Sequence, residues 1–116
     1  MKPKLKLTFA EIRAVFTYAE YIRAVLKIEK RMVCNKNLFR LIEINTEIEA
    51  ITQVEKKFLV ALTEESFSNK KTKTVALKPI EALVLLKYQN IYHTDVDFNR
   101  HVLDLHFPEL WKMMMR

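Results

Sequence analysis

The chain has 116 residues, half of them hydrophobic and 29% charged, so it can bury the core of one domain and is neither disordered nor a membrane span. It contains no glycine, which excludes the glycine-rich phosphate-binding loops of Rossmann and Walker nucleotide enzymes and disfavours a protein built from tight hairpins. Its single cysteine excludes an internal disulfide framework, and its net charge of +6 suits an acidic partner.

The first predicted helix spans residues 9–33 and follows a lysine-rich lead, residues 2–6. Thr8 and Glu11 have the spacing of a capping box, whose side chains satisfy free amide groups at a helix start. Apolar residues recur at intervals of three and four, which puts them on one face of the helix. This stripe consists of Ile12, Val15, Ala19, Ile22, Leu26, Glu29 and Val33, and Glu29 is its one polar member.

A second predicted helix, 37–66, carries a matching stripe, and a turn centred on Asn35 folds the two helices into an antiparallel hairpin. In this register Leu26 lies opposite Ile44, and the other stripe residues pair layer by layer. A second capping-box spacing just after Asn45 supports an alternative in which the helix breaks there.

Each stripe contains one glutamate, and the register places Glu29 near Leu41 and Glu55 near Val15. The second helix alone is expected to be about 43 Å long, which exceeds what a compact domain of this size requires. The ends of such a hairpin project. We expect either the C-terminal part of the chain or a second subunit to cover them.

Residues 67–78 form a predicted basic linker, in which β-branched residues at 74–77 favour an extended segment or a brief strand. Pro79 suits the first position of a third helix, 79–92, because its missing N–H group is not needed there. Apolar residues lie almost all round this helix, which is typical of a central helix or of one at an interface.

The last segment, 95–115, is predicted as a broken fourth helix. Thr94 or Asp95 is expected to cap its start, and Leu105 is expected to face inward. Pro108 is expected to begin a separate last turn, since proline interrupts a helix.

The predicted fold is therefore all-α: a long antiparallel helical hairpin completed by two shorter C-terminal helices, in a three- or four-helix bundle. We expect a single helical domain over residues 1–116. The longest apolar run, 82–86, is far shorter than the roughly 20 residues that a membrane helix needs. The N-terminus has no apolar signal core, so a cytoplasmic protein with no membrane partner is expected.

Basic residues gather near the predicted hairpin turn: Lys27, Lys30, Arg31, Lys36 and Arg40. One interpretation is that they complement the dipole of the first helix and are otherwise solvated. The other is contact with an anion or a nucleic acid, which Arg40 favours because a helix start is unfavourable for a cation. A second group is Lys70, Lys71 and Lys73, which either joins the N-terminal lysines in a patch or forms a solubilising loop.

The densest polar group lies in and before the fourth segment: His93, Asp95, Asp97, His101, Asp104 and His106. Asp97, His101 and Asp104 fall at i, i+4 and i+7 on one helix face, where two carboxylates beside an imidazole could hold a divalent metal or act as acid and base. The spacing matches no zincin or EF-hand pattern, and no clear further ligand is evident. We therefore predict no metal, no cofactor and no catalytic residue.

Two sets of apolar residues are predicted to form a protein interface: Leu83 and Leu86 in the third helix, and Trp111, Met113 and Met114 near the end of the chain. Methionine suits a pliable docking surface because its side chain is flexible and polarisable. The alternative is that the same residues close the core.

The first functional hypothesis is a small non-enzymatic interaction module, such as an adaptor, assembly factor or regulator, that binds a protein partner or itself as a homodimer. It rests on the long apolar stripes and on the lack of a reactive constellation. The second is a nucleic-acid-binding or transcription-related protein that uses the basic hairpin tip and the basic linker. No convincing helix-turn-helix supports the second hypothesis, and no small-molecule substrate is predicted.

Overall fold

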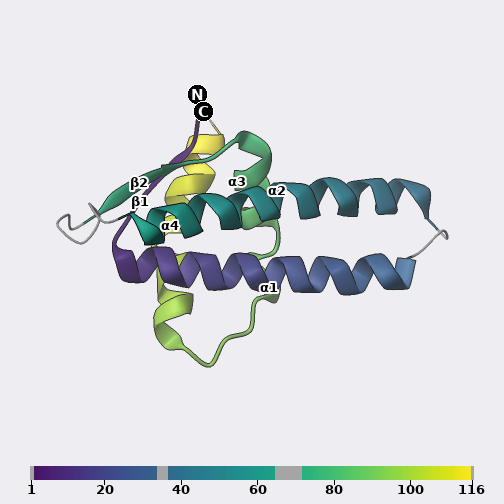
Figure 1. Cartoon of the computed structure of the whole chain (residues 1–116), viewed down its shortest axis with the longest axis horizontal. Helices are drawn as coiled ribbons and strands as arrows, with labels where there is room; N and C mark the ends of the chain where they lie inside the picture. Colours follow the sequence, from purple (N-terminus) through teal and green to yellow (C-terminus); the bar gives the residue numbers. More distant parts are fainter. Residues whose placement is uncertain (1, 34–36, 65–71, 116) are drawn as a thin grey trace.

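The computed structural model of the chain describes residues 2–33, 37–64 and 72–115. Two long antiparallel helices, α1 (Phe9–Val33) and α2 (Leu38–Thr63), form a hairpin, and two C-terminal helices pack against it (Figure 1). This arrangement confirms the predicted fold class. The difference is a small antiparallel sheet, which joins the N-terminal lead to the segment between α2 and the third helix.

The helix α1 begins where the capping-box spacing predicts. The Thr8 N–H donates to Oε1 of Glu11 at 2.8 Å, and the Glu11 N–H donates to Oγ1 of Thr8 at 3.2 Å. These reciprocal bonds satisfy two amide groups that a helix start otherwise leaves free. The bounds of α1 coincide with those expected from the sequence.

The helix α2 is continuous through Asn45, so the alternative with a break there is wrong. Its start is fixed by Asn37, whose side-chain oxygen accepts the N–H of Arg40 at 3.1 Å. It ends at Thr63, three residues earlier than expected. The predicted turn centre, Asn35, lies outside the described residues.

The sheet consists of β1 (Lys4–Leu7) and β2 (Lys73–Ala76), with Lys4 opposite Ala76 and Leu5 opposite Val75. In β1 the leucines are buried and the lysines are exposed. This alternation has the period of a half-buried strand, and it is the signal that the sequence analysis missed. The strand β2 lies inside the predicted linker, close to the place where a brief strand was one of two expectations.

The helix α3 (Pro79–Lys87) is shorter than predicted, because a 3-10 turn, η2 (Gln89–Ile91), follows it. Its start is fixed by Glu81, whose Oε1 accepts the N–H of Lys78 at 2.8 Å. The same oxygen accepts a hydrogen bond from Nζ of Lys57 at 2.5 Å. A buried glutamate thus ties the start of α3 to α2.

The helix α4 (Asp97–Met114) runs through Pro108 without the predicted break. Proline removes the hydrogen bond to the carbonyl of Asp104, and because Asp104 is exposed this carbonyl can be hydrated instead. The expected side-chain cap by Thr94 or Asp95 is also wrong, since Val96 occupies the N-cap position without one. Leu105 is 53% exposed and does not face inward.

The core occupies only one part of the hairpin. The sheet, α3 and α4 pack near the start of α1 and the end of α2 (Figure 1). Towards the turn, no described hairpin residue beyond Leu26 and Ile44 is buried. The molecule is therefore elongated, with a longest dimension of 50 Å.

The glutamates within the two stripes have cationic partners, which corrects the expectation of apolar neighbours. Nε of Arg23 donates to Glu55 at 2.6 Å, and Arg40 binds Glu29. The pairing of individual stripe residues across the hairpin stays a prediction.

Tyr18 links α1 to the C-terminal helices at the centre of the core. Its hydroxyl donates to the carbonyl of Leu85 at 2.5 Å, and its ring lies 4.9 Å from that of Tyr92 and 5.5 Å from that of Phe107. Leu85 is in the last turn of α3, where carbonyl groups lack partners within the helix. Burial raises the pKa of Tyr18 above its ordinary value, so the hydroxyl remains a donor.

We predict that Tyr18→Phe lowers the free energy of unfolding by about 1–2 kcal/mol, because it leaves the buried carbonyl of Leu85 without its donor. Urea denaturation followed by circular dichroism measures the change. The matched control is Tyr21→Phe, which removes a hydroxyl whose bond to the carbonyl of Ile91 is exposed. We expect a loss below about 0.5 kcal/mol there, and equal losses in both variants would contradict the assignment.

Candidate interaction surfaces

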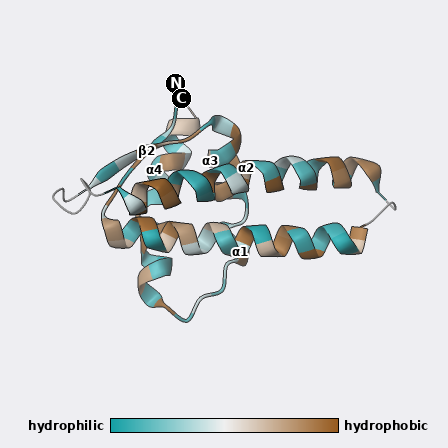
Figure 2. Cartoon of the chain, in the orientation of Figure 1, coloured by the Kyte–Doolittle hydropathy of each residue, from teal (hydrophilic) through white to brown (hydrophobic). Residues whose placement is uncertain are grey.

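The hairpin end, defined here as residues 27–33 and 37–43, exposes large apolar side chains. Phe39 is 87% exposed and Met32 is 75% exposed. The set is Ile28, Met32, Leu38, Phe39 and Ile42. Figure 2 shows hydrophobic residues at this end of both helices, where no other element lies over them. Scattered exposed apolar residues are ordinary on a protein surface, whereas a group of them is typical of an interaction site.

The cations predicted at the hairpin turn are not equivalent. Lys27, Lys30 and Arg31 are exposed on α1, and Lys36 lies outside the described residues. Arg40 is directed inward and binds Glu29 with two bonds, Nη2 to Oε1 at 2.6 Å and Nε to Oε2 at 2.7 Å. Its guanidinium group is thus already paired inside the molecule, which favours a structural role over contact with an external anion.

Arg40 belongs to an ion-pair network centred on Glu47, which is only 4% exposed. Oε1 of Glu47 accepts from the hydroxyl of Tyr88 at 3.0 Å and from Nη1 of Arg40 at 3.1 Å. Nζ of Lys87 lies 3.2 Å from Oε2 of Glu47 and 2.8 Å from Oε1 of Glu43. The network joins α1, α2 and the end of α3, and the sequence analysis did not identify Glu47.

Ion pairs within this network favour the ionised forms of Glu29, Glu43 and Lys87. The hydrogen bond from Arg40 keeps the pKa of Glu29 below its ordinary value, and that from Lys87 does the same for Glu43. Burial lowers the pKa of Lys87, but its bonds to Glu43 and Glu47 outweigh this effect and raise the pKa to about 12. Three carboxylates thus face two cations and leave an excess of negative charge.

A groove of about 360 Å³ runs between α2 and α3 beside this network. Its walls are formed by Glu43, Thr46, Glu47, Ile80, Leu83, Val84 and Lys87. Leu83, a predicted interface residue, lies in the groove and is exposed. Leu86 is only 6% exposed and belongs to the core, so its prediction as an interface residue is wrong.

The predicted cluster near the end of the chain divides between surface and core. Trp111 is 52% exposed, whereas Met113 and Met114 are half-buried and Met114 packs against the core. Trp111 therefore remains available to a partner, while Met114 closes the core as the alternative interpretation expected.

The polar residues of α4 do not form a cluster. His93, Asp97 and His101 are exposed, and Asp104 pairs with Arg100 at 3.1 Å. Within the described parts of the chain, no three His, Cys, Asp or Glu side chains come together in a way that could hold a metal ion.

The histidine of this group with a defined partner is His106, although its pairing with Glu11 was not predicted. Its Nε2 lies 2.6 Å from Oε2 of Glu11 and so joins α4 to the start of α1. Burial raises the pKa of Glu11, but bonds from the Thr8 N–H and from His106 outweigh it and lower the pKa below its ordinary value.

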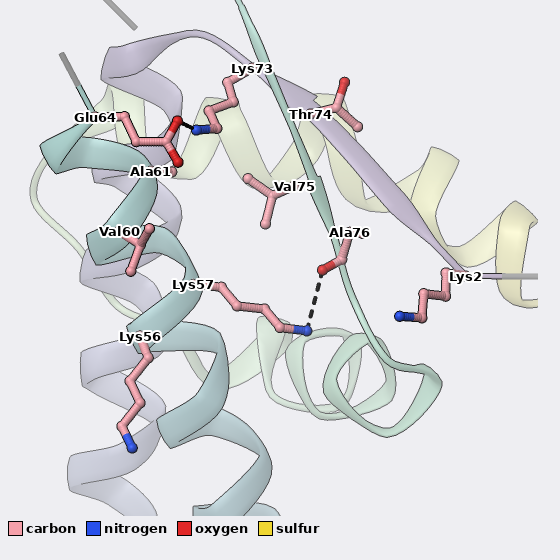
Figure 3. Close-up of a pocket in the computed structure, with 10 residues that line it drawn as sticks. All are labelled: Lys2, Lys56, Lys57, Val60, Ala61, Glu64, Lys73, Thr74, Val75 and Ala76. Carbon is pink, nitrogen blue, oxygen red and sulfur yellow. Dashed lines mark hydrogen bonds and ion pairs between the residues drawn. The ribbon is translucent and has the colours of Figure 1, made fainter. Parts of the chain in front are cut away.

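A second groove, of about 470 Å³, lies between α2 and β2 and is rich in lysine (Figure 3). Its lysines are Lys2, Lys56, Lys57 and Lys73. Nζ of Lys57 donates to the carbonyl of Ala76 at 3.3 Å, and Lys73 forms an ion pair with Glu64. Lys73 thus lies beside the N-terminal lysines, as one interpretation expected, whereas Lys70 and Lys71 lie outside the described residues.

Comparison of the chain with protein-family models, with curated proteins and with solved structures gives no match. Among the residues that the structure describes, no helix has the length and apolar content needed to cross a membrane.

We predict that Arg40→Gln lowers the free energy of unfolding by about 2–3 kcal/mol, because charged hydrogen bonds to Glu29 and to the buried Glu47 are lost. Lys30→Gln is the matched control, since it removes one exposed cation from the same end of the hairpin. We expect the control to change stability by less than about 0.5 kcal/mol. Thermal or urea denaturation measures both, and similar losses would show that total charge matters more than the network.

The network also predicts a pH dependence. Glu29 and Glu43 have lowered pKa values in the folded state, so their contribution to stability is present above the ordinary value of 4.5 and is lost as the pH falls through their folded pKa values. We expect the free energy of unfolding to fall below about pH 4.5 in the native chain. The fall should be shallower in Arg40→Gln, where Glu29 has lost its partner. Parallel pH profiles of the two proteins would contradict this.

Proposed function

We propose that the chain is a non-enzymatic helical interaction module that forms a homodimer through its hairpin end. The observation that carries this proposal is the exposure of five large apolar side chains on a projecting helix pair that α3, α4 and the sheet leave uncovered. The apolar side chains at this end of the hairpin need another element to pack against. The described part of the chain supplies none there.

The apolar area at the hairpin end is enough for a moderate interaction. A large apolar side chain contributes about 1.5–3 kcal/mol when it is fully buried, so the exposed parts of five contribute on the order of 5–10 kcal/mol. Loss of translational and rotational freedom on association opposes this with about 4–15 kcal/mol. The balance favours a dimer whose population depends on concentration, with polar contacts at the rim deciding which partner fits.

The charges beside the apolar residues support a second copy of the chain as the partner. The exposed face of α1 near the turn carries Lys27 and Lys30, while α2 carries the exposed Glu49, and Glu43 is exposed but already pairs with Arg40 and Lys87. In a two-fold dimer, α1 of one copy can pack against α2 of the other, which brings these opposite charges together. The product is a four-helix arrangement at the centre of the dimer, in which both hairpin ends are covered.

Such a dimer leaves other surfaces available, which fits the proposed roles as an adaptor, assembly factor or regulator. The groove beside Leu83 shares only Glu43 with the hairpin end, and the exposed Trp111 lies outside it. A protein partner with an apolar anchor and a cationic neighbour would suit the groove, because Glu43 and Glu47 lie at its wall.

We predict that Phe39→Asp weakens the dimer at least about tenfold, because it removes a large apolar contact and buries a charge in its place. The substitution should leave the monomer folded, since Phe39 is in the first turn of α2, where an acidic residue suits the helix dipole. Sedimentation equilibrium over a range of protein concentrations measures the dissociation constant.

Leu105→Asp is the control for this experiment, because it introduces the same charge at an exposed apolar residue far from the hairpin turn in the sequence. We expect its dissociation constant to equal that of the native chain. A native chain that is monomeric at every concentration, or an equal effect of both substitutions, would refute dimerisation through the hairpin end.

A further inference from the structure

The outer face of the two-stranded sheet is cationic. Lys4 and Lys6 of β1 are exposed, and the residues directly opposite them, Ala76 and Thr74, are small and also exposed. The Leu77 N–H donates to the carbonyl of Pro3 at 2.8 Å, which extends the strand pairing beyond β1. The same register brings the exposed residues Lys2 and Lys78 close to each other across the strands.

A lysine-rich groove lies beside the sheet, between β2 and α2, and Lys2 is the lysine of the N-terminal lead that lines it. Lys73, which is opposite the buried Leu7, is on the other face of the sheet from Lys4 and Lys6. In Figure 3 the side chain of Lys2 points toward Lys57, and Lys73 and Lys56 lie along the same groove. One lysine of the N-terminal lead, two of α2 and one of β2 thus line the groove, while Lys4 and Lys6 lie on the adjoining sheet face. Since all of them come from elements tied together by hydrogen bonds, the surface is fixed by the fold.

The carboxylates near this surface neutralise only part of its charge. Glu64 pairs with Lys73, and the buried Glu81 pairs with Lys57. Lys2, Lys4, Lys6 and Lys56 add positive charge around these two pairs. Like charges held close together on a sheet are destabilising, so a bound polyanion would relieve their repulsion.

We propose that the sheet face and its lysine-rich groove bind the phosphate backbone of double-stranded nucleic acid without reading its sequence. Alternate residues on a strand are about 6.7 Å apart, so Lys2, Lys4 and Lys6 span about 13 Å. Over that length each strand of a duplex presents about four phosphates. Lysine acts on phosphate as a point charge and carries no sequence information.

The shape and composition of the site favour a duplex over other polyanions. Lys2 joins the exposed lysines of β1 to a concave groove, which suits a rod-shaped ligand better than a flat membrane surface does. Of the described residues that line the groove, none is aromatic, so stacking on the unpaired bases of a single strand is not supported there. The site differs from the hairpin tip, the other basic group predicted from the sequence, where Arg40 is already paired.

The test is fluorescence anisotropy of the full chain with a labelled DNA duplex of about 20 base pairs, from about 50 to 200 mM salt. The test variant replaces Lys2, Lys4 and Lys6 with glutamine. We expect it to weaken binding at least about tenfold and to lower the slope of log affinity against log salt by about 2–3, since each lost phosphate contact accounts for about 0.9.

The matched control replaces Lys27, Lys30 and Arg31 with glutamine, which removes the same charge from the hairpin end. We expect its affinity to stay within about twofold of the native chain. Lys56→Gln tests the other wall of the groove without touching the sheet, and it should lower the salt slope by about 1. Unchanged circular dichroism spectra show that the variants are folded.

Several results would overturn the proposal. These are no duplex binding by the native chain at low salt, equal losses in the two triple variants, tighter binding of a single strand than of the duplex, or displacement of the duplex by vesicles rich in phosphatidylserine. The proposal does not depend on dimerisation. A monomeric Phe39→Asp protein should still show the salt slope of the native chain, expressed per chain.

Discussion

The packing of α1 against α2 is the contact on which every other part of the structure depends. The buried stripe runs from Ile12 and Phe58 at one end to Leu26 and Ile44 near the turn. The nine-residue helix α3 is too short to be stable alone, α4 contains a proline, and a two-stranded sheet is marginal in water. Each becomes stable by covering part of the hairpin, so the extent of this cover decides where apolar surface remains.

The ion-pair network marks the boundary between the covered and uncovered parts of the hairpin. Glu47 loses its hydration by burial, and the bonds from Arg40, Lys87 and Tyr88 offset that cost. Replacing a buried ion-pair network with apolar residues often preserves the stability of a protein. Such a network therefore serves mainly to select one arrangement of the packed elements. Here the network fixes the end of α3 on α2 and prevents the apolar core from extending toward the turn.

Much of the fold could be predicted from the sequence, because the hairpin follows from apolar periodicity and a capping box, both of which act over a few residues. The errors lie where longer-range contacts decide. Pro108 does not break α4, since the carbonyl of Asp104, which loses its hydrogen bond, belongs to an exposed residue and can be hydrated. Leu86 belongs to the core because the face of α3 that carries it packs inward.

The candidate sites were less predictable, because their residues come from distant segments. The partner of β1 is about 70 residues away in the sequence, so the lysines of the lead could not be placed beside Lys73 with certainty. The alternation of lysine and leucine at residues 4–7 was a usable local signal. By contrast, nothing local distinguishes Arg40, which is paired inside the molecule, from the exposed Lys30 on the opposite helix.

The sheet lies at the end of the hairpin opposite the turn (Figure 1), and this separation has a geometric consequence. Two copies joined at their turns would hold their sheets at the far ends of one rod, with rigid helices as the spacer. Because helices do not coil as flexible linkers do, the distance between the two ends would be nearly constant. Ligands presented at that separation would gain from bivalency, and those at other separations would not. The elongated dimer would then select ligands by the distance between their two binding points.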